Sequence, residues 1–125
     1  MITGHVNTER EAIVSLVVRG PEGQEQTVEA IIDTGFTGLI TLPPHLIEAL
    51  GLQYRGRAWV VLGDGSESQF EIFEAGVVWE GKLRQVAVDA ADTEPLVGMS
   101  LLAGHELAMQ VVPGGTVLIR PLFLS

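Results

Sequence analysis

The sequence predicts an all-β fold, a closed or partly open β-barrel with one or two short helices. Three observations lead to this prediction. The apolar residues come in short runs rich in β-branched types, turn sequences separate these runs, and only two short segments have helical spacing. A length of 125 residues with 46% apolar content suits one domain over residues 1–125 with a real core.

Short apolar runs mark the expected strands. They cover residues 13–18, 28–32, 39–42, 59–62, 70–73, 77–79, 86–88, 109–112 and 116–119. The turns between them contain glycine or proline, as in Gly20-Pro21-Glu22-Gly23, Gly63-Asp64-Gly65-Ser66, Glu80-Gly81-Lys82 and Pro113-Gly114-Gly115. Many short strands joined by tight turns are typical of a barrel or a sandwich.

Two segments predict helices. Residues 45–50 follow Pro43-Pro44, have apolar side chains at helical spacing and stop at Gly51, which suits a C-cap. Residues 100–107 begin at a possible N-cap, Ser100, but contain Gly104, so we expect a turn or two at most. This assignment puts His105 and Glu106 on the outer face of the second helix.

Charge and composition exclude several classes of function. The formal charge of −9, from 7 basic and 16 acidic residues, repels nucleic acid and anionic lipid. The chain has no cysteine for a disulfide or a thiolate metal site, and its three histidines have no metal-ligand spacing. Neither a signal peptide nor an apolar run of membrane-spanning length is present. We expect a soluble, cytoplasmic protein without a metal or cofactor.

One carboxylate stands out at the end of an expected strand. The apolar residues Ala30-Ile31-Ile32 lead directly into Asp33, Thr34 and Gly35. A carboxylate at a buried strand end is unfavourable unless it is hydrogen-bonded, paired or functional. Asp33 could equally satisfy its own turn, because aspartate often does so before glycine. The spacing alone leaves both interpretations open.

A second stretch gives this motif a context. About sixty residues downstream, Pro95-Leu96-Val97-Gly98 precedes the second expected helix. Together the two stretches resemble the retropepsin-like (clan AA) aspartic proteases, in which an apolar strand, Asp-Thr/Ser-Gly, a hairpin flap, an apolar pair with glycine and a helical turn follow in this order. The phenylalanine at Phe36 resembles the prokaryotic subgroup with Asp-Thr-Gly-Phe. The resemblance covers most of the chain.

The resemblance implies an aspartic endopeptidase with a peptide or protein substrate. Its catalytic residues would be Asp33, Thr34 and Gly35. The chemistry needs two carboxylates that share a proton, and the chain has one such motif, so the resemblance implies a homodimer with one Asp33 from each subunit. Thr34 would hydrogen-bond across the interface, and Gly35 would let the backbone approach the partner and the peptide.

The resemblance also implies a substrate-binding surface. The hairpin of residues 62–70 would be a flap that closes over the peptide, unless it is an ordinary surface hairpin. Asp64 fits a turn former better than a catalytic acid. The expected substrate-binding residues are Phe36, Leu62, Gly63, Asp64, Gly65, Ser66 and Gly98.

Two departures from the viral members bear on the dimer. Thr37 and Met99 stand where those members have an acidic residue and an arginine that pair with each other. The apolar C-terminal run 117–124 could hold the dimer instead. A dimeric peptide- or protein-binding module without catalysis, and an oligomeric scaffold in which the loop fills a contact, remain as other interpretations.

Overall fold

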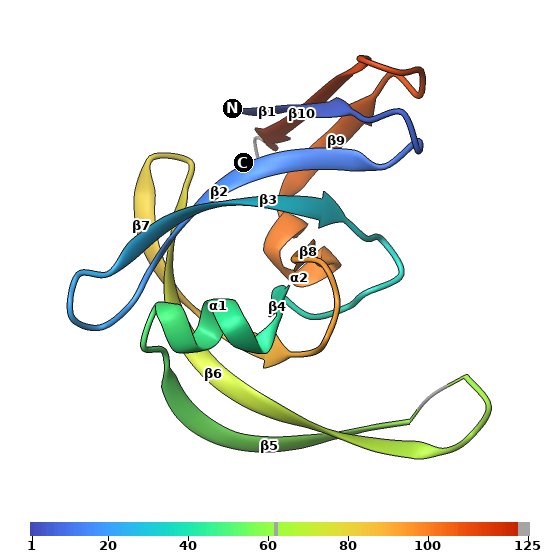
Figure 1. Ribbon diagram of the computed structural model, residues 1–125. Coiled ribbons are helices and arrows are strands. Elements are labelled where there is room, and N and C mark those ends of the chain that lie inside the picture. The colour runs from blue at the N-terminus through green and yellow to red at the C-terminus, as the bar shows by residue number, and fades with distance from the viewer. Residues whose placement is uncertain (62, 123–125) are drawn as a thin grey trace.

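The computed structural model describes residues 1–61 and 63–122 (Figure 1). In chain order the elements are β1 Ile2–Val6, β2 Ala12–Arg19, β3 Glu25–Ile32, β4 Ile40–Leu42, α1 Pro44–Ala49, β5 Gln53–Val61, β6 Glu67–Trp79, β7 Lys82–Ala90, β8 Leu96–Val97, α2 Met99–Leu102, β9 His105–Met109 and β10 Thr116–Pro121.

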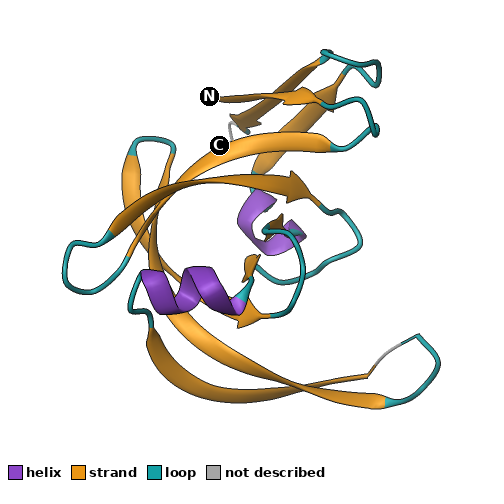
Figure 2. Ribbon diagram, in the orientation of Figure 1, coloured by secondary structure: helices purple, strands orange, loops and turns teal. Residues whose placement is uncertain are grey.

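Six strands close into a mixed barrel. The order of hydrogen-bonded neighbours is β6-β7-β4-β8-β3-β2, and β2 pairs with β6 to complete the ring. The β3–β8 and β4–β7 pairs are parallel. Two short helices lie beside the barrel strands, α1 directly after β4 and α2 directly after β8 (Figure 2). The prediction of an all-β barrel with short helices is confirmed.

The barrel interior follows from the period-2 pattern of its strands. In β2, Ala12, Val14, Leu16 and Val18 are buried and alternate with more exposed residues, because successive side chains of a strand point to opposite faces. The short strand β4 is buried at all three residues, which suits its position between other strands, and in β8 Val97 is buried while Leu96 is partly exposed. The core thus surrounds the strands that carry the candidate site.

Strands outside the ring extend the molecule in two directions. β5 pairs with β6 in a long hairpin that projects from one end of the barrel, and β1, β10 and β9 continue the sheet beyond β2 (Figure 1). The hairpin tip, the loop after β3, the β1–β2 turn and the β9–β10 turn all lie on the right-hand side of that view.

Several sequence-based boundaries were wrong. His105 and Glu106 begin strand β9 instead of continuing a helix, because α2 ends at Leu102 and Gly104 adopts a positive φ of 83° that turns the chain. The expected strand 109–112 is mostly the turn after β9. Strand β1 was missed because Gly4 and His5 interrupt its apolar pattern, and its pairing with β2 and β10 supplies what propensity does not.

The first residues of the C-terminal run pair within their own chain. Residues 116–121 form β10, which pairs with β1 along one edge and with β9 along the other. Val117 and Ile119 are buried in the core of their own chain. This part of the run therefore has no free strand edge to offer a partner.

Helices of this chain are short. Over the described ranges, none is long and apolar enough to cross a membrane.

Candidate functional site

Backbone hydrogen bonds fix Asp33 at the end of β3. Its N–H donates to the carbonyl oxygen of Val97 in β8 at 2.9 Å, and its carbonyl oxygen accepts from the N–H of Phe36 at 3.1 Å. The first bond continues the parallel β3–β8 ladder by one residue, and the second closes a turn. Asp33 therefore stands where a strand ends and a loop begins, half-exposed on a rigid base.

The loop after Asp33 is clamped to the segment that begins α2. The N–H of Gly98 donates to Leu39 at 2.9 Å, that of Met99 to Phe36 at 2.8 Å and that of Ser100 to Gly38 at 3.1 Å. The hydroxyl of Ser100 also donates to the carbonyl oxygen of Thr37. These bonds join the two sequence stretches that predicted the site.

Two glycines let these segments approach each other. A Cβ on Gly98 would lie 2.2 Å from the carbonyl oxygen of Gly38 and 2.6 Å from ring carbon Cδ2 of Phe36. A Cβ on Gly38 would lie 2.5 Å from Cζ of the same ring. The Phe36 ring thus packs against both glycines, and any side chain there would force the loop away from α2.

One carboxylate oxygen of Asp33 is hydrogen-bonded within its own turn. Oδ1 accepts the N–H of Gly35 at 2.9 Å, which is the Asx-type bond expected if Asp33 stabilises its own turn. Among the described residues, none donates a hydrogen bond to Oδ2. The carboxylate can therefore hold the loop with one oxygen while the other is available to a ligand.

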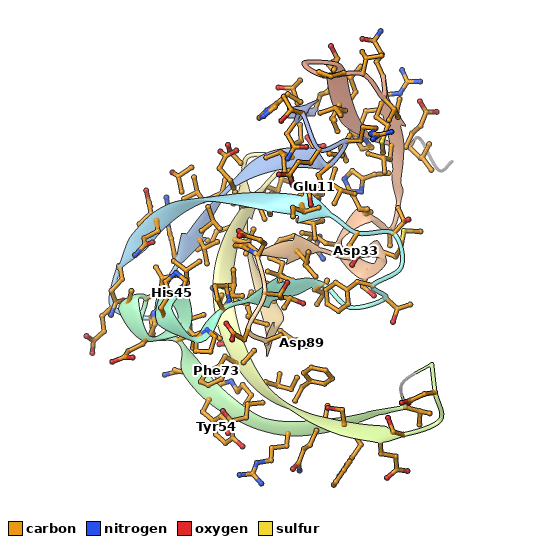
Figure 3. All side chains as sticks on the ribbon, turned by 45° about the vertical axis from the view of Figure 1, so that its right-hand side comes forward. Glu11, Asp33, His45, Tyr54, Phe73 and Asp89 are labelled. Carbon is orange, nitrogen blue, oxygen red and sulfur yellow. The ribbon has the colours of Figure 1, made fainter. Side chains whose placement is uncertain are left out.

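Asp33 borders a hollow of about 470 Å³, which we call the Asp33 pocket. Its walls come from the 33–38 loop, from Thr41 of β4, from Phe70 of β6 and from the chain between Asp89 and Leu96. Figure 3 shows Asp33 on the loop after β3 and Asp89 on the side nearer the β5–β6 hairpin. The pocket therefore lies between the barrel end and that hairpin.

Asp89 is a wall residue that sequence reasoning missed. It lies near the end of β7, and its Oδ2 would be 3.4 Å from a Cβ on Gly38. Burial raises the pKa of its carboxyl above the ordinary value. A usable signal was present, because Val86 and Val88 lead into Asp89 as Ile31 and Ile32 lead into Asp33. In the part of the chain that the structure describes, no group of three or more acidic or histidine side chains could hold a metal ion.

Comparison with known proteins identifies the fold. No family model matches the chain, and no curated protein matches it. The solved structures that are similar to it include two proteases. The protease of EIAV in complex with the inhibitor HBY-793 has a TM-score of 0.61 at 14% identity, over 77% of this chain and 88% of the protease. A retropepsin-like aspartic protease from Rickettsia conorii has a TM-score of 0.57 at 14% identity, over 98% of this chain and 91% of its own. The chain has the retropepsin fold.

Within this retropepsin fold, the hairpin tip stands apart from Asp33. Gly63, Asp64, Gly65 and Ser66 are exposed at the end of the β5–β6 hairpin and do not line the Asp33 pocket, whereas Phe70 of the same hairpin does. Leu62 lies outside the described residues. Figure 1 shows the hairpin projecting away from the barrel.

Asp64 acts as the turn former that the sequence indicated. Its Oδ1 accepts the backbone N–H of Ser66 at 2.9 Å and the hydroxyl of Ser66 at 2.5 Å. The side-chain bond, followed by the backbone bond, lowers the pKa of the exposed Asp64 carboxyl.

Thr34 faces a second hollow of the retropepsin fold. This hollow, of about 590 Å³, shares Asp33 with the Asp33 pocket and is also lined by Glu11, Thr34 and Met109. Asp33 therefore borders two hollows, and the exposed Thr34 lines the second one.

Proposed function

We propose that this chain is an aspartic endopeptidase that acts as a homodimer, with Asp33 of each subunit in one shared site. The observation that carries the proposal is the position of Asp33. On a retropepsin fold, it ends a barrel strand, keeps one carboxylate oxygen free of hydrogen bonds from described residues and borders a pocket beside a long hairpin.

The chemistry explains why two copies are needed. Two carboxylates a few ångströms apart cannot both ionise, so the pair shares one proton. The ionised member takes a proton from a water, and that water attacks the peptide carbonyl while the protonated member donates to the carbonyl oxygen. The Asp33 pocket of a single chain holds one Asp-Thr-Gly carboxylate, and a two-fold axis beside it would supply the second.

Exposed apolar side chains mark a surface for the dimer. Met99 follows Gly98 at the start of α2, Met109 shares the second hollow with Thr34, and Val111 and Val112 lie in the β9–β10 turn. All four are exposed in the single chain, with exposed fractions between 39% for Met109 and 58% for Val111. Because β10 has both edges occupied, we propose that these side chains and Thr34 form the contact instead of an exchanged C-terminal strand.

An extended peptide is the ligand that suits the Asp33 pocket. The β5–β6 hairpin contributes Phe70 to the wall of the pocket, and the similar EIAV protease structure contains an inhibitor. A hairpin that closes over a bound chain would exclude water and add main-chain hydrogen bonds, while the pocket would select side chains. Phe36 lines this pocket, and its ring packs against Gly38 and Gly98.

The second candidate is a dimeric module that binds peptides without cutting them. The bond from Gly35 to Oδ1 favours it, since Asp33 then has a structural role that needs no chemistry. The same pocket and hairpin would serve for binding. The two candidates differ in whether the free oxygen of Asp33 does chemistry.

Peptide cleavage tests the proposal. A random peptide library is incubated at several pH values with the wild type, with Asp33→Asn and with Glu22→Gln, which removes an exposed carboxylate in the β2–β3 turn. Sedimentation establishes whether each protein is a dimer, and circular dichroism establishes folding. We expect Asp33→Asn to lower the cleavage rate by at least about a hundredfold and Glu22→Gln to match the wild type.

The other outcomes separate the candidates. A folded wild-type dimer that cuts no peptide at any pH contradicts the endopeptidase and favours the binding module. A chain that remains monomeric at all concentrations rules out the shared site.

A further inference from the structure

The Asp33 pocket contains a second carboxylate whose charge has no partner. Asp89 is half-buried, and among the residues that the structure describes none forms a hydrogen bond or an ion pair with its side chain. Burial alone raises its pKa, since no bond opposes the effect. An unpaired carboxylate in such a place is unfavourable unless a ligand completes it.

The walls around Asp89 suit the stem of a long side chain. Phe36, Phe70, Ala91 and Leu96 give the pocket apolar surface in the same hollow as the Asp89 carboxylate. Lysine and arginine place an apolar stem along such walls and keep the charged end at a polar group. The volume of about 470 Å³ accommodates a side chain of this length.

The charge of the pocket has one sign. Among the described residues, its titratable wall residues are Asp33 and Asp89, and no lysine, arginine or histidine of this part of the chain lines it. The chain as a whole carries a formal charge of −9. A cationic side chain is therefore attracted to the pocket, and an anionic one is repelled.

We propose that the carboxylate of Asp89 selects peptides that carry a lysine or arginine side chain beside the scissile bond. This inference rests on the proposed function, because a scissile bond exists only if the chain cleaves peptides. Recognition of the lysine or arginine side chain needs only a peptide in the Asp33 pocket. Asp33 and Asp89 line the same hollow. A peptide side chain that reaches Asp89 therefore belongs to a residue close to the peptide bond that lies at the Asp33 carboxylate.

Binding to a variant that cannot cut provides the test. Short fluorescent peptides of alanine and valine carry lysine, norleucine or glutamate at one position, which is moved along the peptide. Their dissociation constants are measured by anisotropy with Asp33→Asn and with the double variant Asp33→Asn, Asp89→Asn. Norleucine has the apolar stem of lysine without the charge, so the comparison isolates the ammonium group.

We expect one position at which lysine binds about tenfold more tightly than norleucine, which is the lower end of what a charged hydrogen bond contributes. Glutamate at that position should bind most weakly. In the double variant, which keeps the size of the side chain, the preference for lysine should disappear. Circular dichroism of both variants establishes that they remain folded.

The test separates the inference from the proposed function. Cleavage by the wild type without any preference for lysine in binding overturns the inference alone. A preference for lysine that depends on Asp89, in a wild type that cuts nothing, overturns the endopeptidase and retains the selectivity. A preference that persists without Asp89, or peptides that bind to neither variant, overturns the inference.

Discussion

Substitution of Gly98 tests whether close contact between the Asp33 loop and α2 holds the site together. In Gly98→Ala the new Cβ would lie 2.2 Å from the carbonyl oxygen of Gly38. Carbon and oxygen make contact at about 3.3 Å, so the two segments must separate by about 1 Å. That shift strains the Ser100–Gly38 and Gly98–Leu39 hydrogen bonds, which are 3.1 and 2.9 Å long.

The expected loss of stability is about 3 kcal/mol. Overpacking in a filled interior costs about 1–3 kcal/mol, and each weakened hydrogen bond adds up to about 1 kcal/mol. The loss is a large fraction of the total stability of a small domain and lowers Tm by on the order of 10 °C.

Urea unfolding at one fixed protein concentration measures the effect, since a dimer gains stability with concentration. Gly63→Ala is the matched control, because its Cβ would meet no atom within 4 Å and its φ is not positive. Equal unfolding free energies for the two variants would refute the argument from close packing.

The remaining predictions concern the core and the two aspartates with shifted pKa values. Leu101→Ala, at a fully buried position of α2, should lower the unfolding free energy by about 2–5 kcal/mol, against less than about 1 kcal/mol for the exposed Leu83→Ala; similar losses would contradict the assigned core. Because the folded-state pKa of Asp89 is raised above 3.8, its stabilising contribution is present below that pH and is lost as the pH rises through the folded-state pKa. Asp89→Asn should therefore gain stability relative to the wild type as the pH increases in chemical unfolding experiments. The folded-state pKa of Asp64 is lowered, so its stabilising contribution is present above pH 3.8 and is lost as the pH falls through the folded-state pKa. Asp64→Asn should therefore lose stability relative to the wild type as the pH increases. If both variants change in the same direction, the assigned environments are contradicted.

Local sequence patterns located most of the barrel strands and the Asp33 turn, although the two expected strands 70–73 and 77–79 are one strand, β6, and β8 was not expected as a strand. The alternation of β2 and the apolar residues before Asp33 depend on nearest neighbours along the chain, so they can be read without a fold. Strand β1 could not be read in this way, because its pairing with β10 comes from residues far away in the sequence. The start of β9 was missed for a local reason, since Gly104 turns the chain directly before it.

The residues of the candidate site also fall into those that the sequence indicated and those that it did not. The sequence indicated Asp33, Gly35 and Gly98, since each stands in a motif whose order along the chain is informative. It did not indicate Asp89, because the parallel pairing of β4 with β7 brings that carboxylate to Gly38 across about fifty residues of chain. It also gave no measure of how far the hairpin tip lies from the pocket.

By itself, the sequence determined the class of fold, the place of one carboxylate at a strand end and the acidic charge of the chain, because these depend on residue type and local order. The tertiary structure alone decided that β10 is occupied on both edges and that Asp33 and Asp89 share one pocket. The first depends on the pairing of β10 with β1, which come from opposite ends of the chain. The second depends on the β3–β8 and β4–β7 pairings of the closed barrel, which join strands distant in sequence.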